Sequence, residues 1–584
     1  MSRWPPRRAH LRRRAASGPF STFVCNVSVQ RAVARDVGRL TGTIALAIVL
    51  LAPGSSRAEF HHDTGLGSEV ADGVSGGERG AALEALERWD LPAARAAFAR
   101  LGAPQAPSDL LLASRLAFYA GEYAEAVRLL ALVPPAVAAL EPVAAYARLA
   151  AASLALDGRL AVKESEHFEL HFDAELDWVL AEPALAALEA GYRAIGAWLG
   201  ERAPQKVRVE IVAVAADFER VSGLEREQIE TSGAVGVSAF NKIMVLSPRL
   251  LLRGYPWRDT LNHEYLHYLI VRLSANRAPI WLQEGLARSA EARWRTAAAA
   301  ADLDDLERSL LARALRENQL IPFSAMDGSL LRLPSPGAVR LAAAECAFAV
   351  DYLIEGWGVG SVGRLLAELA RTPPSQGQDP ALEAVIGEPF ARFESGWRRL
   401  LEQRGFREVA GIVVPPYRLA GTGDAETWDL AEWQPLAAQS HLRLGDLLRA
   451  RGNARAGLME FEKARAAAPA SPYAQVKTAR ALLELGRAEE AATAARAAVR
   501  LARGYPAANL ALAAALAALG DHESEVEALR AALEINPFDY VAWRDLGRAL
   551  RHLGRVQEAQ QASVAALRLA PRDEKFQRSV MQDE

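Results

Sequence analysis

The chain has 584 residues, a net charge of -3 at pH 7, and 51% hydrophobic residues. This length is enough for about three domains, and the composition is that of an alanine- and leucine-rich, mostly helical globular protein. Basic and acidic residues are interspersed, which excludes the long basic stripe of a nucleic-acid-binding surface. We therefore expect no nucleic acid among the partners.

An export signal is predicted at the N-terminus. The apolar run from Leu40 to Ala52 follows an arginine-rich segment and precedes Ser56-Arg57-Ala58, a small-x-small pattern that suits signal peptidase. The run is too short to span a membrane comfortably. We predict a signal peptide over residues 1–58 and export to the periplasm or the exterior of a bacterial cell. An uncleaved signal that anchors the chain to the membrane is the alternative, and a start of translation at Val33 or Val37 would shorten this long leader.

Two further segments precede the next domain. A linker rich in glycine and charge is predicted over residues 59–80, and its His61-His62 pair is not expected to bind metal. Residues 81–160 are predicted to be helical and similar to tetratricopeptide repeats, because Gly121 to Ala126 has the sequence of a turn between two repeat helices. Removal of Cys25 with the signal would leave Cys346 as the single cysteine, so no internal disulfide is expected.

Alternating apolar residues then predict a small α/β lobe. Phe168, Leu170 and Phe172 alternate, Val207 to Val214 alternates again, and Leu185 to Leu199 between them has a helical pattern. Residues 232–247 contain glycine and lead into Lys242-Ile243-Met244-Val245-Leu246. Two roles are open for this run: an edge strand that pairs with an extended peptide, or an ordinary buried strand.

Two histidines four residues apart predict a metal site. In His263-Glu264-Tyr265-Leu266-His267, a helix brings both imidazoles to one face and leaves Glu264 beside them. Pro279 begins a second helical pattern, so Glu284 in Trp281-Leu282-Gln283-Glu284-Gly285-Leu286-Ala287 falls in its first turns. We predict that His263, His267 and Glu284 bind one Zn²⁺ ion and that Glu264 is the general base. Glu291 is the alternative, either as a ligand or as a hydrogen-bond partner of a histidine. An amphipathic helix with ordinary surface or core histidines is the other interpretation of the first motif.

These residues resemble the gluzincin metallopeptidases, and in particular the bacterial peptidase MA-like family, which carries HExxH followed by a W-L-x-E-G-L-A segment. The resemblance covers about Val162 to Arg404 and implies a thermolysin-like fold, with a small sheet lobe, a helical lobe and a cleft between them. It also implies hydrolysis of peptide bonds, in which Glu264 activates a zinc-bound water and passes the proton to the leaving amine.

Two positions depart from the family pattern. Arg288 stands where relatives often carry an acidic residue, so Glu291 is expected to orient a histidine in its place. Ala347 stands where a tyrosine is often found in a later helix. Tyr265, Tyr268 and Tyr352 are then the remaining tyrosines considered for stabilising the oxyanion.

The rest of the chain is predicted to be helical. Patterns at about residues 302–316, 338–355, 361–371 and 390–403 complete a peptidase domain over residues 161–408, and Pro415-Pro416 marks a linker over residues 409–437. Gly452, Gly486, Gly520 and Gly554 are then spaced by 34 residues, and Pro469, Pro537 and Pro571 keep this period, which Arg503 interrupts. This is the tetratricopeptide period, so four repeats are predicted over residues 438–572, followed by a tail over residues 573–584. Their concave surface is expected to bind a peptide or protein, or else to serve packing alone.

The sequence as a whole predicts an α+β, predominantly helical protein, with a zinc peptidase domain flanked by helical repeats. The predicted function is that of an exported zinc-dependent metallopeptidase whose repeats bind a peptide or protein substrate or a protein partner. Membrane association is expected only if the signal stays uncleaved. A catalytically silent scaffold of the cell envelope and a zinc hydrolase of non-peptide amides are the alternatives.

Overall fold

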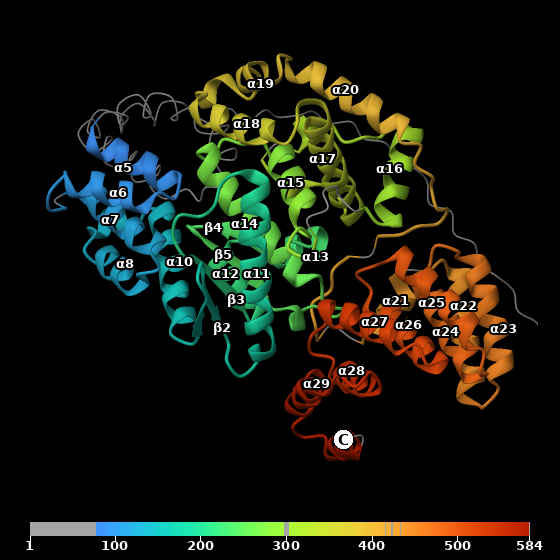
Figure 1. Ribbon diagram of the computed structural model, residues 1–584. Coiled ribbons are helices and arrows are strands. Elements are labelled where there is room, and N and C mark those ends of the chain that lie inside the picture. The colour runs from blue at the N-terminus through green and yellow to red at the C-terminus, as the bar shows by residue number, and fades with distance from the viewer. Residues whose placement is uncertain are drawn as a thin grey trace, which may run out of the picture.

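The computed structural model describes residues 77–582, apart from residues 105, 297–302, 327, 415, 422–423 and 433 (Figure 1). The predicted signal peptide, Cys25, His61-His62 and most of the first predicted linker lie outside the described residues. The described part is predominantly helical and includes one small sheet. None of its helices has the length and apolar character needed to cross a membrane.

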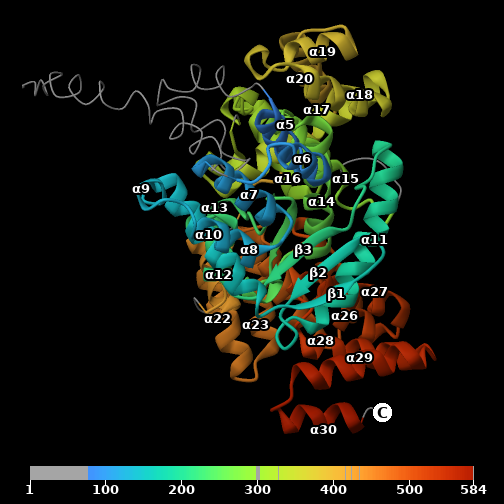
Figure 2. The ribbon, with the colours of Figure 1, turned by 90° about the vertical axis from the view of Figure 1, so that its left-hand side faces the viewer.

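Helices α5 to α10 lie beside the sheet (Figures 1 and 2). Their amphipathic pattern is clear in α8, where Tyr123, Ala126 and Leu130 are buried while Glu125 and Arg128 pair on the outer side. The helices are α5 (Glu78–Glu87), α6 (Leu91–Ala99), α7 (Pro107–Tyr119), α8 (Tyr123–Leu130), α9 (Pro135–Ala138) and α10 (Glu141–Asp157).

A buried polar cluster fastens this helical region to the sheet. Lys242 Nζ lies 2.8 Å from the Glu210 carboxylate and 2.9 Å from the Tyr123 hydroxyl, and all three side chains are buried. Burial raises the pKa of Glu210, but Lys242 and Arg208 outweigh this effect and lower it to about 2. Glu210 therefore stays charged at ordinary pH, because this buried carboxylate has cationic partners.

The sheet contains five strands in the order β1-β2-β3-β5-β4. Strands β2, β3 and β5 are parallel neighbours, while β1 and β4 run antiparallel at the two edges. Helix α11 (Trp178–Leu199) connects β2 to β3, and α12 (Ala215–Ser222) and α13 (Arg226–Ser232) connect β3 to β4. The strands are β1 (Ala161–Glu164), β2 (Phe168–Phe172), β3 (Val207–Val212), β4 (Gly236–Ala239) and β5 (Lys242–Leu246).

The run from Lys242 to Leu246 is an interior strand, not an edge strand. It is β5, which pairs with β3 on one side and with β4 on the other, and all five of its residues are buried. Of the two roles that the sequence left open, the buried strand is correct. The edge belongs to β4, because the chain reverses at Phe240 and Asn241, both at positive φ, and places β5 between β3 and β4.

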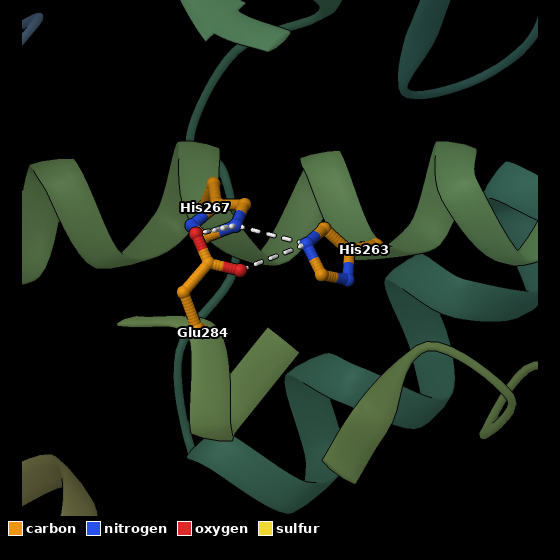
Figure 3. A group of neighbouring side chains, drawn as sticks. All are labelled: His263, His267 and Glu284. Carbon is orange, nitrogen blue, oxygen red and sulfur yellow. Dashed lines mark hydrogen bonds and ion pairs between the residues drawn. The ribbon is translucent and has the colours of Figure 1, made fainter. Parts of the chain in front are cut away.

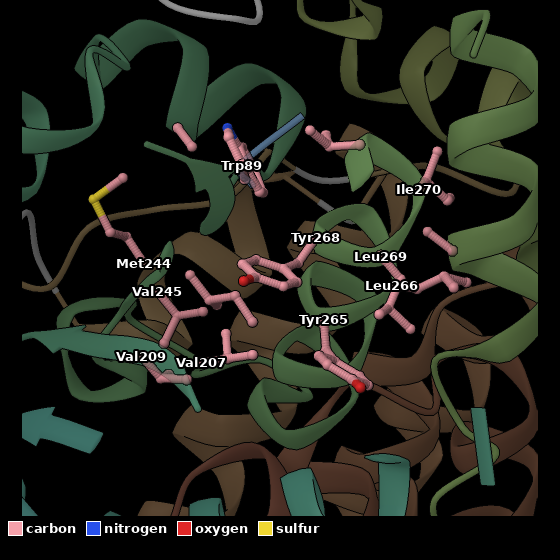
Figure 4. Close-up of a cluster of buried hydrophobic side chains, with 14 of the residues drawn as sticks. Trp89, Val207, Val209, Met244, Val245, Tyr265, Leu266, Tyr268, Leu269 and Ile270 are labelled. Carbon is pink, nitrogen blue, oxygen red and sulfur yellow. The ribbon is translucent and has the colours of Figure 1, made fainter. Parts of the chain in front are cut away.

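The helix that carries both histidines packs its opposite face on the sheet. Helix α14 (Trp257–Ser274) follows the short helix η1 (Pro248–Leu250) and directs Tyr265 and Tyr268 into a core shared with Val209 and Val245 of the sheet (Figure 4). Burial of such side chains contributes about 1.5–3 kcal/mol each. This packing fixes the rotation of α14 and turns His263 and His267 away from the sheet.

A second group of helices lies on the other side of α14 (Figure 1). Here α15 packs closely on α17, because a Cβ at Gly285 would stand 2.3 Å from the Cys346 carbonyl oxygen. Cys346 itself is buried and free. The helices are α15 (Ile280–Ala290), α16 (Asp305–Glu317), α17 (Pro336–Trp357), α18 (Gly360–Arg371), α19 (Asp379–Ile386) and α20 (Phe390–Gln403), with short helices η2 (Phe323–Ala325), η3 (Leu330–Arg332) and η4 (Pro374–Gln376).

The segment that was predicted to be a linker makes specific contacts. We call residues 409–414 and 416–420 the strap. The Val409 amide donates to Ser309 Oγ (2.8 Å), the Tyr417 amide to the Glu230 carbonyl (3.0 Å), and the Leu252 amide to the Arg418 carbonyl (2.8 Å). The strap therefore connects α16 to α13 and to the segment that precedes α14. Helix α21 (Ala425–Glu432) follows within the same predicted linker.

Four helical hairpins follow, in the range where the sequence predicts four repeats. The glycines spaced by 34 residues end the first helix of each hairpin at φ values from 71° to 77°, where glycine carries no Cβ penalty. The hairpins are α22 (Leu436–Ala450) with α23 (Ala454–Ala467), α24 (Pro472–Glu484) with α25 (Ala488–Leu501), α26 (Pro506–Leu519) with α27 (His522–Ile535), and α28 (Tyr540–His552) with α29 (Val556–Leu569). Helix α30 (Glu574–Gln582) lies in the predicted tail.

Candidate metal centre

The three predicted ligands come together from two helices. His263 and His267 lie one turn apart on α14, and Glu284 reaches them from α15 (Figure 3). Their ligand atoms lie within 4.8 Å of one another. Within the described part of the chain, this is the group of three histidine, cysteine, aspartate or glutamate residues that could hold a metal ion. The side chains are 14–26% exposed, so the group can be reached from a cavity while most of its surface is buried.

The spacing of these atoms fits a zinc ion. The two Nε2 atoms are 3.0 Å apart, and the Glu284 oxygens lie 3.7 Å from His263 Nε2 and 3.8 Å from His267 Nε2. Tetrahedral zinc with bonds of about 2.0–2.2 Å separates its ligand atoms by about 3.3–3.5 Å. Two imidazoles and one carboxylate are also a ligand set that catalytic zinc sites use, with the fourth position left open.

Glu291 orients one of the histidines. Its carboxylate oxygen lies 3.1 Å from His263 Nδ1, on the opposite side of the ring from Glu284. A carboxylate can only accept this bond, so Nδ1 carries the proton and Nε2 faces the other ligands. Of the two roles considered for Glu291, the structure supports that of hydrogen-bond partner.

Arg288 fixes Glu291 in place. Arg288 Nη1 lies 2.5 Å from Glu291, and Arg288 Nη2 lies 2.9 Å from Glu307, which is buried on α16. Arg340 of α17 approaches Glu307 at 3.6 Å and so extends the same chain of charges. Arg288 therefore holds the carboxylate of Glu291 in position beside His263.

Glu264 is buried beside the edge strand. Its side chain faces Gly236, where a Cβ would stand 2.7 Å from Glu264 Oε1, and its backbone carbonyl accepts a hydrogen bond from Ser238 Oγ at 2.6 Å. Burial raises the pKa of Glu264 to about 7. Such a carboxyl group can both accept and donate a proton near neutral pH.

The two imidazoles differ in basicity without a metal. Burial lowers the pKa of His263, but hydrogen bonds to Glu284 and Glu291 outweigh it and raise the pKa to about 10. Burial lowers the pKa of His267 to about 4. Neutral imidazoles are the form that binds metal, so His263 would have to give up a proton when a metal binds.

The three side chains and Glu264 open into a cavity of about 2570 Å³. Most of its walls come from β4 with α14, the helices from α15 to α17, the strap, and the loops between the repeats; Trp89 and residues in and around α13 also line it. The repeat residues are Ala470, Pro472, Leu501 to Tyr505, Ala531, Glu534 and Ile535. Drug-sized ligand sites measure about 300–1,000 Å³, so this cavity is larger than a small-molecule pocket.

The tyrosines considered for the oxyanion do not line the cavity. Tyr265 packs edge-on against Phe168, Tyr268 donates to Asn241 (2.9 Å), and the Tyr352 ring lies against Phe393. Each belongs to the core, as Ala347 does.

Tyr417 of the strap lines the cavity, and its hydroxyl is available to donate a hydrogen bond to a bound substrate. The other tyrosines of its lining are Tyr255, which donates to the Leu246 carbonyl, and Tyr505, which lies 2.5 Å from Asp429. The Tyr417 hydroxyl makes no hydrogen bond within the described part of the chain. No sequence pattern marked Tyr417 as a functional residue, because the surrounding residues have the composition of a linker.

The comparisons with known proteins identify the repeats. Residues 506–539 and residues 528–561 each match a family model of the tetratricopeptide repeat. The first match spans α26 and α27, and the second is offset by part of a repeat. The C-terminal region therefore contains tetratricopeptide repeats, which support a protein-binding role. No curated protein matches the chain.

Solved structures are also similar to part of this chain. A crystal structure of MamA is 16% identical, and the match covers 25% of this chain and 87% of that one, with a TM-score of 0.23. MamA residues 41 to the end from Desulfovibrio magneticus are 17% identical over 26% of this chain and 92% of that one, with a TM-score of 0.23. The first tetratricopeptide domain of Spaghetti (RPAP3), bound to the HSP90 peptide SRMEEVD, is 23% identical over 21% of this chain and 98% of that one, with a TM-score of 0.20.

Proposed function

We propose that the protein is an exported zinc-dependent metallopeptidase of the gluzincin type, with a thermolysin-like arrangement of a sheet lobe and a helical lobe. The observation that carries this proposal is the convergence of His263, His267 and Glu284 at tetrahedral spacing, beside a buried Glu264, in a large cavity. An ordinary packing role would not require two imidazoles and two carboxylates to face one another in a partly buried site.

The chemistry follows from the positions of these groups. A zinc ion held by His263, His267 and Glu284 would supply Lewis acidity toward the scissile carbonyl and lower the pKa of water. Glu264 accepts a proton from the attacking water and passes it to the leaving nitrogen, while the carbon–oxygen bond forms and the carbon–nitrogen bond breaks. Glu291 keeps His263 in the tautomer that a metal ligand needs.

The substrate would lie along β4. This strand is at the sheet edge, its residues line the cavity, and Ser238 connects it to the carbonyl of Glu264. An edge strand offers backbone hydrogen-bond groups to an extended peptide with little regard to its side chains. We therefore assign to β4, and not to Lys242 to Leu246, the edge strand that pairs with an extended peptide.

Zinc content tests the proposal without knowledge of the substrate. The purified protein should bind one zinc ion per chain, and Glu284→Ala should lose it while keeping its helical circular dichroism. Zinc-loaded wild type should cleave peptides from an unbiased library, whereas Glu264→Gln should bind zinc but leave the peptides intact. A folded wild-type protein without zinc affinity would favour the scaffold, in which the repeats bind a partner and the site is silent.

A further inference from the structure

The repeats form one wall of the cavity instead of extending away from it. Their contribution comes from the loop edge, which we define as Ala470 to Pro472, Leu501 to Tyr505 and Ala531 to Ile535. These residues lie where the second helix of a hairpin ends and the next hairpin begins. The sequence led us to expect binding on the concave surface, but the loop edge is the part that faces the metal centre.

Contacts of Glu534 and Ile535, at one end of the loop edge, hold this wall in place. The Tyr255 amide donates to the Ile535 carbonyl (3.1 Å), and Glu534 pairs with Arg258 (3.0 Å) and with Arg295. A Cβ at Gly254 would stand 2.1 Å from the Ile535 oxygen, so the two backbones touch. The repeats are thus docked on the segment that leads directly into α14.

The size of the cavity limits what can reach the metal centre. A volume of about 2570 Å³ equals that of a sphere with a radius of about 8.5 Å. A folded domain of 100 residues has a radius of gyration of about 13 Å and does not fit. An extended chain rises about 3.3 Å per residue, so about five residues span the cavity. The occupant is therefore an extended segment of polypeptide.

The lining of the cavity carries more positive than negative charges. It contains ten arginines and no lysine against seven carboxylates, and the charged residues of the lining that are exposed are all arginines, namely Arg295, Arg308, Arg332 and Arg503, of which Arg295 and Arg308 also pair with carboxylates. The carboxylates of the lining are buried or half-buried. Outside the metal centre each of them is paired with an arginine, as Asp259 and Glu534 are with Arg295, and Asp304 and Glu307 are with Arg340.

Arg503 brings this charge to the repeat wall. It occupies the position at which the repeat period otherwise places Pro469, Pro537 and Pro571, and it is exposed on the loop edge. We propose that the cavity binds extended polypeptide segments with acidic side chains, and that Arg503 is the specificity-determining residue on the repeat wall. This inference rests on the proposed peptidase function, since it names the substrate of that site.

Peptide binding by a variant that cannot cleave tests the inference. Full-length, zinc-loaded Glu264→Gln is titrated into fluorescently labelled ten-residue peptides that differ only in carrying glutamate, glutamine or lysine at alternate positions. The glutamate peptide should bind at least tenfold more tightly than the glutamine peptide, and the lysine peptide least tightly. Adding Arg503→Glu should weaken the glutamate peptide about tenfold, as expected for reversing one partly exposed charge, and leave the glutamine peptide unchanged.

The matched control is Arg487→Glu in the same background. Arg487 lies in the turn before α25, pairs with Glu490 and does not line the cavity, so the affinities should not change. An acidic polypeptide kept unfolded by reduction and alkylation should compete with the glutamate peptide, while its folded form should not.

The possible failures are distinguishable. Equal affinity for the glutamate and lysine peptides, equal effects of Arg503→Glu and Arg487→Glu, or competition by the folded form would each overturn the inference while leaving the peptidase intact. Absence of zinc binding or of cleavage by the wild type would refute the peptidase function instead, whatever the peptide affinities.

Discussion

A glycine-to-alanine substitution at Gly254 measures how much the docking of the repeats contributes to the free energy of unfolding. Gly254→Ala adds a Cβ that would stand 2.1 Å from the Ile535 carbonyl oxygen, at a backbone φ of 72°. Gly554→Ala is the matched control, because Gly554 has a φ of 71° but meets nothing within 4 Å. Both substitutions place alanine in the left-handed region, which costs about 1–2 kcal/mol. Their difference isolates the contact between the repeats and the segment before α14.

The expected difference follows from the contacts that must yield. Moving Ile535 away breaks the hydrogen bond from the Tyr255 amide, which is worth about 1 kcal/mol. It also separates Glu534 from Arg258, an ion pair whose side chains are 18% and 26% exposed and which contributes up to about 1 kcal/mol. Gly254→Ala should therefore lose about 1–2 kcal/mol more than Gly554→Ala in the free energy of unfolding.

Urea denaturation followed by circular dichroism and by tryptophan fluorescence gives this difference. Undocked repeats should also unfold separately, so the two signals should stop coinciding in Gly254→Ala and stay coincident in Gly554→Ala. Equal losses in the two variants, with coincident signals in both, would refute the conclusion that the repeats are docked through Gly254.

Four further predictions concern the site and its surroundings. Glu291→Ala should weaken zinc binding 10- to 100-fold in a chelator competition, because His263 loses its partner. Gly236→Ala should lower kcat about 100-fold with zinc content unchanged, because its Cβ displaces Glu264. Tyr417→Phe should lower kcat about 100-fold if its hydroxyl stabilises the oxyanion. Burial raises the pKa of Glu345 to about 8, so its contribution to stability should fall as pH rises from 4.5 to 8 and be about 3 kcal/mol lower at pH 7 than below pH 4.5. Glu345→Gln should reduce the slope measured in urea titrations by this amount.

Each of these predictions has a control or a contrary result. Glu291→Gln keeps an acceptor and should lose less zinc affinity than Glu291→Ala; the reverse order would contradict the orienting role. Gly356→Ala adds a Cβ that meets nothing within 4 Å, so its kcat should match the wild type. A change in KM alone in Tyr417→Phe would point to substrate binding. The sign for Glu345 holds because the folded state keeps a proton that the unfolded state releases above pH 4.5, and equal slopes in the wild type and Glu345→Gln would argue against it.

The local parts of the site could be read from the sequence. The spacing of His263 and His267 fixes their common face once a helix forms, because residues four apart stack along one side. Glu284 was found in the same way, from the proline that begins its helix. The 34-residue period likewise gave the repeats, since each hairpin is a local unit with its own glycine turn.

The tertiary structure decided what these local units do together. The order β3-β5-β4, set by the reversal at Phe240 and Asn241, made β4 the edge strand and put Gly236 against Glu264. Glu284 and Glu291 are equally acidic in the sequence, and only the angle between α14 and α15 directs one to the Nε2 atoms and the other to Nδ1. The loop edge of the repeats faces the metal centre through contacts between residues hundreds of positions apart, which periodicity and spacing, being local properties, cannot specify.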